Sequence, residues 1–173
     1  MNLTIKIFLL AILIGVSSCG LTKKSYYKDR FITHTEIEKF PLSYGIINDY
    51  EHLFTLEQKK ELDSIIRDFT IKTTNQICVV SIETFEPYTS LKDFTTDLGN
   101  YWVVGGNKKN GLVITISKNK RAIWIGTGFG TEKVLTDETV QKVIKTQMLP
   151  FFKEEKYFEG VKTGLQELMK LWE

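Results

Sequence analysis

The stretch Asn110–Asp137 constrains the fold most, because it joins a β-hairpin to a glycine-rich loop and to the start of a helix. Two runs of β-forming residues flank the polar turn at 118–121, which predicts a pair of antiparallel strands. The second strand leads into three glycines spaced two apart, and Thr136 then fits the N-cap of a helix with acidic residues in its first turn. A loop rich in accessible backbone groups is therefore expected close to carboxylate side chains.

The rest of the pattern alternates strands with helices. An apolar run at Gln76–Ile82 predicts a buried strand, and helical spacing predicts a first helix over about 56–73 and a last one near 157–171. Ser90 opens a helix between the buried strand and the hairpin, and Pro150 is expected to end the helix that follows the glycine loop. This alternation predicts an α/β fold, a three-layer α/β/α sandwich whose mixed sheet is mostly parallel with one antiparallel hairpin.

The first eighteen residues predict a secretory signal. Lys6 is followed by the apolar run 7–16 and by small residues before Cys19, and the run is shorter than the roughly 18 residues of a membrane span. The tetrad Val16-Ser-Ser-Cys19 resembles the bacterial lipobox, which implies cleavage before Cys19 and attachment of palmitate-like acyl chains to it. Two or more chains anchor a protein stably. An ordinary secreted protein with an exposed lone thiol is the alternative.

These features divide the chain into a signal peptide at 1–18, a lipidated cysteine with a tether at 19–39, and one folded domain at 40–173. Gly20 is not an aspartate-type retention signal, so the expected location is the outer membrane, facing the periplasm. Basic and acidic residues nearly balance, at 23 and 21, which argues against a nucleic-acid partner. The expected partners are the membrane, through the lipid, and another envelope protein.

Several kinds of chemistry lack their motifs. The glycines at 126, 128 and 130 do not have the spacing of a dinucleotide-binding loop, and Lys133 lacks the Ser or Thr that follows the lysine of a phosphate-binding loop, so no nucleotide is expected. There is no G-x-S-x-G nucleophile motif, and both histidines are isolated. Cys78 lies in the predicted buried strand, which favours a structural thiol over a nucleophile.

Four polar side chains could converge on a hard cation: Asp49, Asn110, Glu132 and Asp137. Carboxylate and amide oxygens from separate loops suit calcium, or magnesium, better than zinc. Each acid also has a simpler explanation, since Asp137 could cap a helix, Glu132 could be solvated and Asp49 could close an Asx-turn. Any phosphatase activity would have to be metal-assisted and would use Asp49 and Asp137.

A longer set of residues resembles the TPM domain, a family shared by thylakoid lumen proteins, an animal receptor-associated protein and many bacterial envelope proteins. The resemblance spans roughly 40–164. The matching residues are Phe40-Pro41, Gly45–Tyr50, Gln76-Ile77, Val79-Val80, Trp102, Gly105, Asn110-Gly-Leu112, Arg121, Ile125, Gly128-Phe-Gly130, Glu132, Leu135-Thr-Asp137, Pro150-Phe-Phe152, Tyr157 and Gly160.

The resemblance implies an α/β sandwich of Rossmann-like appearance, divalent-cation binding in some members, and an acid phosphatase label. Asp49, Asn110, Glu132 and Asp137 fall on recurring polar positions of the family. Lys109 stands where many members have an acid and Phe129 where tyrosine is usual, departures expected to weaken cation binding and phosphoester chemistry. The sequence therefore favours a lipid-anchored envelope module for binding or assembly, without strong catalysis. The alternative is a weak metal-assisted acid phosphatase.

Overall fold

The computed structural model describes residues 39–173. The expected signal peptide, Cys19 and the tether up to residue 38 lie outside this part of the chain. Residues Phe40–Glu173 form one compact unit. Within the described part, none of the helices has the length and apolar character needed to cross a membrane.

The centre of the unit is a four-stranded sheet in the order β1-β2-β3-β4, with β1 at Ile47–Asp49, β2 at Gln76–Ser81, β3 at Gly111–Ser117 and β4 at Ala122–Thr127. The first three strands are parallel, and β4 pairs antiparallel with β3. All seven residues of β3 are buried, as expected for a strand covered on both faces. The predicted mixed sheet with its hairpin is confirmed, and β1 is an additional short strand within the segment expected only to be extended.

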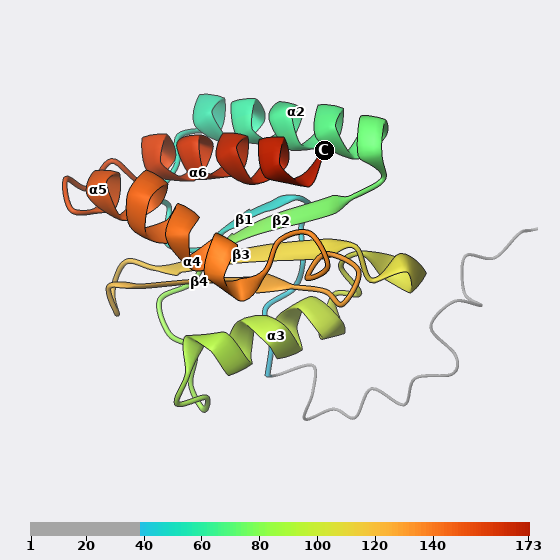
Figure 1. Ribbon diagram of the computed structural model, residues 1–173. Helices are drawn as coiled ribbons and strands as arrows, with labels where there is room; N and C mark the ends of the chain where they lie inside the picture. The colour runs from blue at the N-terminus through green and yellow to red at the C-terminus, as the bar shows by residue number, and fades with distance from the viewer. Residues whose placement is uncertain (1–38) are drawn as a thin grey trace, which may run out of the picture. The chain divides into compact units, whose positions relative to one another are not determined.

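Helices cover both faces of the sheet (Figure 1), so the predicted three-layer α/β/α sandwich is confirmed. One face carries α2 (Leu56–Thr73), α4 (Asp137–Val143) and α6 (Tyr157–Trp172), and the other carries α3 (Leu91–Tyr101). Alternate residues of each central strand serve the two cores: Ile77 and Val79 face the first, and Cys78 and Val80 the second. The short helix η1 (Gly106–Lys108) precedes β3.

The connections after β1 and β2 leave the sheet toward opposite faces, because α2 and α3 lie in different layers. Both connections step in the same direction along the sheet, so they have opposite hands, and one of them departs from the usual right-handed crossover. A crevice forms where neighbouring loops diverge in this way at the carboxyl ends of parallel strands, and open α/β sheets bind their ligands there.

The expectation that Pro150 ends the third helix is wrong. Helix α4 continues as a π-helix at Ile144–Met148 and then as α5 at Leu149–Phe152, with Pro150 in the first turn of α5. Proline is tolerated there because an N–H at that position is not needed for the helix, and the wider π-turn accommodates the change. The chain therefore stays helical to Phe152, which brings α5 to the end of the sheet where β1–β3 finish.

Two names are used below for the ends of the sheet. The carboxyl end is the end at which β1, β2 and β3 finish, and it includes the turn between β3 and β4. The amino end is the opposite end, where these three strands begin and where β4 finishes in the glycine loop.

Candidate functional site

The four residues expected to share a cation are divided between the two ends. Asp49 closes β1 and is level with Ser81 and, through it, with Ile116 of β3. Asn110 immediately precedes the first residue of β3, six residues from Ile116. At about 3.3 Å per residue, Asp49 and Asn110 are about 20 Å apart along the strand direction. The structure therefore does not bring Asp49 together with Asn110.

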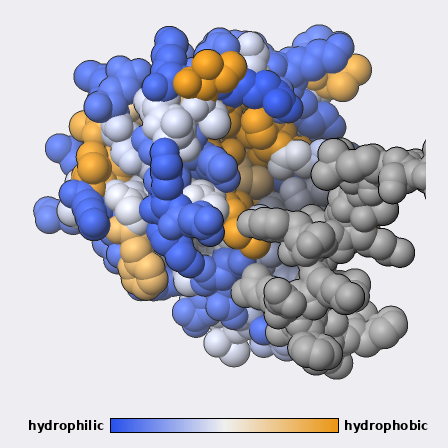
Figure 2. Space-filling model, turned by 90° about the vertical axis from the view of Figure 1, so that its right-hand side faces the viewer, coloured by the Kyte–Doolittle hydropathy of each residue, from blue (hydrophilic) through white to orange (hydrophobic). Residues whose placement is uncertain are grey.

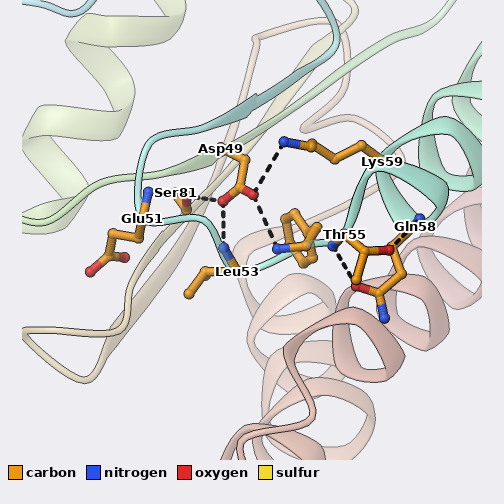
Figure 3. A network of polar contacts seen from close by, with 8 residues as sticks. Asp49, Glu51, Leu53, Thr55, Gln58, Lys59 and Ser81 are labelled. Atoms are coloured by element: carbon orange, nitrogen blue, oxygen red, sulfur yellow. Dashed lines mark hydrogen bonds and ion pairs between the residues drawn. The ribbon is translucent and has the colours of Figure 1, made fainter.

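Asp49 is occupied in organising the loop to α2 (Figure 3). Its side chain is 1% exposed. Its carboxylate accepts hydrogen bonds from the backbone N–H of Leu53 at 2.9 Å, the N–H of Phe54 at 3.1 Å and the Ser81 hydroxyl at 2.5 Å. The Lys59 ammonium lies 3.9 Å away. These contacts show that the Asp49 carboxylate organises the loop that follows it. This role is similar to the alternative stated from the sequence, in which Asp49 closes an Asx-turn.

The other three residues do not form a shared set either. The Asn110 amide donates to the Thr74 carbonyl and to the Asn75 side chain, each at 3.0 Å. Glu132 is exposed and lines a groove between α3 and the glycine loop. Asp137 is exposed in the first turn of α4 and does not line that groove. Among residues 39–173 there is no group of three or more His, Cys, Asp or Glu side chains placed to hold a metal ion. The four residues therefore do not fit a single cation site.

The glycine loop is built by close approach of backbones. A Cβ on Gly128 would lie 2.3 Å from the Lys109 carbonyl oxygen, and one on Gly130 would lie 2.6 Å from that of Lys108. Gly128 N–H donates to the Gly111 carbonyl and Gly130 N–H to that of Lys109, both at 2.9 Å. These two glycines are therefore required for packing the loop against the start of β3, with no phosphate needed to explain them.

The carboxyl end contains a cleft of about 400 Å³ between β4 and the α5–α6 connection. Its wall is apolar and its rim is polar. The wall comprises Ile116, Ala122, Ile123, Leu149 and Phe152, and the rim comprises Ser117, Arg121, Lys153, Glu155 and Tyr157. A shallower hollow, which shares Arg121, Glu155 and Tyr157 with the cleft, extends it toward Glu51, Glu83, Lys118 and Asn119.

The rim is held by a carboxylate from the end of β1. Glu51 accepts hydrogen bonds from the backbone N–H groups of Lys118 at 2.8 Å and Asn119 at 3.0 Å. This fixes the turn of the hairpin. Arg121 closes the turn in the left-handed conformation, with φ of 50°, and its N–H donates to the Lys118 carbonyl. Non-glycine residues in this conformation are uncommon and recur at functional sites.

The charges of the cleft favour an anion. The Lys118 ammonium lies 3.5 Å from the Glu155 carboxylate and 5.6 Å from the centre of the Tyr157 ring. Within the described part of the chain, Arg121 and Lys153 have no ion-pair partner, and neither do Glu51 and Glu83 of the adjoining hollow, so the excess of positive charge is confined to the rim of the cleft itself. Burial raises the pKa of the Tyr157 phenol although Lys118 opposes the shift. The phenol is protonated at neutral pH in any case, so its hydroxyl can donate a hydrogen bond. The apolar wall and the cationic rim together suit a ligand in which an acidic group lies next to an apolar group.

Sequence reasoning did not find this cleft. Arg121 was expected in the polar turn at 118–121 and Tyr157 at the start of the last helix, and both were among the residues of the family resemblance, but neither was expected to line a site. The continuation of the helix past Pro150, which supplies Phe152, was also not predicted. The carboxyl-end rule for parallel strands was the available signal, since the β3–β4 turn lies at that end.

A family model described as the TPM domain matches residues 47–171. The chain belongs to the TPM domain family. The match covers every strand of the sheet and all but the last residue of α6. The resemblance stated from the sequence is therefore confirmed. No curated protein matches the chain.

Solved structures share the fold. The N-terminal domain of a P. gingivalis protein is 26% identical, with a TM-score of 0.67, over 73% of this chain and 80% of that one. The BA42 protein of the psychrophilic bacterium Bizionia argentinensis is 19% identical, with a TM-score of 0.62, over 72% and 88%. The N-terminal domain of the cg2496 protein of Corynebacterium glutamicum is 14% identical, with a TM-score of 0.60, over 78% and 85%. The last two similarities concern the fold alone.

Proposed function

We propose that this protein is a lipid-anchored binding module of the cell envelope, which holds an acidic group of a partner protein in the carboxyl-end cleft. The observation that supports it best is the cleft itself, where an apolar wall meets Arg121 and Lys153, two cations without an ion-pair partner among residues 39–173. An acidic side chain or chain terminus beside an apolar residue matches both parts. The Tyr157 hydroxyl adds a donor for the same anion.

The binding step can be tested with a small probe. N-acetyl-phenylalanine offers one carboxylate next to one apolar side chain, and titration into the domain can be followed by the shifts of backbone amides. We expect shifts at Ser117, Arg121 and Tyr157 and a loss of affinity of about tenfold in Arg121→Gln, because charge-assisted hydrogen bonds contribute about 1.5–3 kcal/mol.

Arg67→Gln is the matched control, since Arg67 is an exposed arginine on α2 that pairs with Asp63. Equal affinity in Arg121→Gln and Arg67→Gln would contradict the proposal. So would shifts confined to residues outside the carboxyl end.

The anchor has a separate test. The lipobox resemblance at Val16–Cys19 supports acylation of Cys19. Cys19→Ser should move the protein from the membrane fraction, expected to be the outer membrane, to the periplasm. A Cys19→Ser protein that remained fully membrane-bound would contradict the lipid anchor and leave the cleft unaffected.

The alternative is weak, metal-assisted phosphomonoesterase activity. The supporting argument is the family's label, because Asp49 and Asp137 occupy different parts of the fold and Asp49 is already hydrogen-bonded to its own loop. Calcium or magnesium binding remains a prediction. Calorimetry of the domain with either ion tests it, with Asp137→Asn as the comparison. Turnover of p-nitrophenyl phosphate that rises with metal and falls in Asp49→Asn and Asp137→Asn would favour the enzyme.

A further inference from the structure

Large apolar side chains are exposed at the amino end of the domain. Ile71, in the last turn of α2, is 80% exposed, and Phe129, in the glycine loop, is 76% exposed. Val103, between α3 and β3, is 47% exposed. At the carboxyl end the corresponding residue is Leu56, the first of α2. Figure 2 looks onto the amino end and shows hydrophobic groups at the surface among hydrophilic ones.

Lysines lie between these apolar residues. Lys109 lines the same groove as Val103 and Phe129. The Lys108 ammonium donates to the Thr74 hydroxyl at 3.1 Å, which links this loop to the end of α2. The resulting surface, called the amino-end patch below, consists of Ile71, Lys72, Val103, Lys108, Lys109 and Phe129. The exposed pair Glu132 and Lys133 follows Phe129 in the loop and adds one charge of each sign.

The first residues of the domain pack along α3, the helix that leads to Val103 of the patch. The Phe40 ring lies 5.1 Å from that of Tyr101 in the last turn of α3 and 5.7 Å from that of Phe94 in its first turn. The Trp102 indole N–H donates to the Pro41 carbonyl at 3.1 Å. Trp102 immediately precedes Val103 of the patch. The described chain therefore begins against α3, whose last residue lies two positions before Val103.

We infer that the amino-end patch rests on an anionic lipid surface, with Phe129, Val103 and Ile71 entering the interface and the lysines next to lipid phosphates. Exposed apolar side chains among basic ones are the usual composition of an interfacial membrane contact. The inference rests on the proposed lipid anchor only for which membrane the patch contacts. The affinity of the patch for anionic lipid is a property of the domain alone.

The local structure suits a lipid better than a protein partner. Lysine is depleted at the centre of protein interfaces, whereas here Lys109 lines the groove with Val103 and Phe129, and Lys72 follows Ile71. The glycine loop can also approach an apolar medium at low cost, because the N–H groups on both sides of Phe129 already donate hydrogen bonds within the protein. Gly128 N–H donates to the Gly111 carbonyl, and Gly130 N–H donates to the Lys109 carbonyl.

The test uses the domain Lys39–Glu173, which contains both core clusters and is compact by itself. Sedimentation with vesicles of phosphatidylethanolamine and phosphatidylglycerol should carry the domain down, and high salt should release it. Phosphatidylcholine vesicles should bind it much less. Phe129→Ser should lower the partition coefficient about tenfold, from the loss of one buried aromatic side chain.

Leu56→Ser is the matched control, an exposed apolar residue at the opposite end, and should leave partition unchanged. Ile71→Ser, in another element, should lower it as Phe129→Ser does. Failure to bind the anionic vesicles would overturn the inference, as would equal losses in Leu56→Ser and Phe129→Ser. Self-association through Phe129 without vesicle binding would assign the patch to a protein contact. Because the assay lacks Cys19, its result is independent of the Cys19→Ser test of the anchor.

Discussion

The two ends of the sheet are assembled by different means. At the carboxyl end, carboxylates from the end of β1 hold backbone N–H groups: Asp49 holds the loop to α2, and Glu51 holds the hairpin turn. At the amino end, backbone meets backbone, and glycines at 105, 111, 128 and 130 allow the approach. The carboxyl end therefore depends on single side chains that substitution can remove, whereas the amino end depends on the absence of side chains.

This difference also separates the proposed roles. The carboxyl end has a cleft with an apolar wall and charged groups fixed around its opening, which suits the recognition of one ligand group. The amino end presents apolar and basic side chains at its surface, which suits contact with a broad surface. One domain can thus face a membrane with one end and a partner with the other.

The largest expected effect is at the amino end. Gly128→Ala should lower the free energy of unfolding by about 3 kcal/mol or more, because the new Cβ would meet the Lys109 carbonyl oxygen at 2.3 Å, and backbone cannot yield as a side chain can. Urea unfolding measures it. Gly106→Ala is the control. Gly106 has φ of +50° but nothing within 4 Å of a Cβ, so the cost should be about 1 kcal/mol. Similar costs for both variants would mean that the glycine loop relaxes easily.

The next effect tests the carboxyl end. Asp49→Asn should lower the free energy of unfolding by about 2 kcal/mol, because an amide has one acceptor oxygen for the hydrogen bonds from Leu53, Phe54 and Ser81. The amide NH₂ group would also face one of these donors and leave it without an acceptor. Asp63→Asn removes an exposed pair with Arg67 and should cost less than about 1 kcal/mol. If Asp49→Asn were as stable as Asp63→Asn but bound calcium less tightly, Asp49 would be a ligand and its structural role would be wrong.

The sequence predicted the parts of the fold that depend on periodicity. Helical spacing placed α2 correctly, where the structure also has a capping box at Thr55 and Gln58, and the apolar run at Gln76–Ile82 placed the central strand. Strand β1 was missed as a separate element because three residues are too few to show a period. The expectation that Pro150 ends the helix was wrong, because a π-turn precedes the proline. That turn lies where Met148 packs against Gly160 and Gly164, a tertiary contact that a local sequence pattern does not show.

The candidate site was less predictable. Asp49, Asn110, Glu132 and Asp137 were grouped because their side chains share a chemistry, but the direction of each strand decides the end at which a residue lies. Asn110 lies at the start of a parallel strand and Asp49 at the finish of another, so shared chemistry did not imply proximity. The wall of the cleft is formed by apolar residues whose types indicate no particular chemistry, such as Ile123 and Leu149, and their convergence is visible only in three dimensions.

A smaller effect concerns the hairpin turn. Glu51→Gln should destabilise the domain by about 1 kcal/mol, because a neutral amide replaces a carboxylate that accepts two backbone hydrogen bonds. Hydrogen exchange should be faster at the amides of Lys118 and Asn119 in particular. Glu83→Gln serves as the comparison, since the Glu83 side chain is exposed in the same hollow. Protection that is unchanged at both amides would show that the turn holds its shape without Glu51.

The smallest expected effect on stability distinguishes strain from function at Arg121. Glycine adopts a φ of 50° without strain, so Arg121→Gly should leave the free energy of unfolding unchanged or raise it by up to about 1 kcal/mol, while removing the guanidinium from the cleft. Arg121→Gln keeps the strain and also removes the charge. If the cleft binds an acidic group, both variants should lose affinity for N-acetyl-phenylalanine to a similar extent, although their stabilities differ. A loss of affinity in Arg121→Gln that Arg121→Gly did not share would mean that the turn conformation matters and the charge does not.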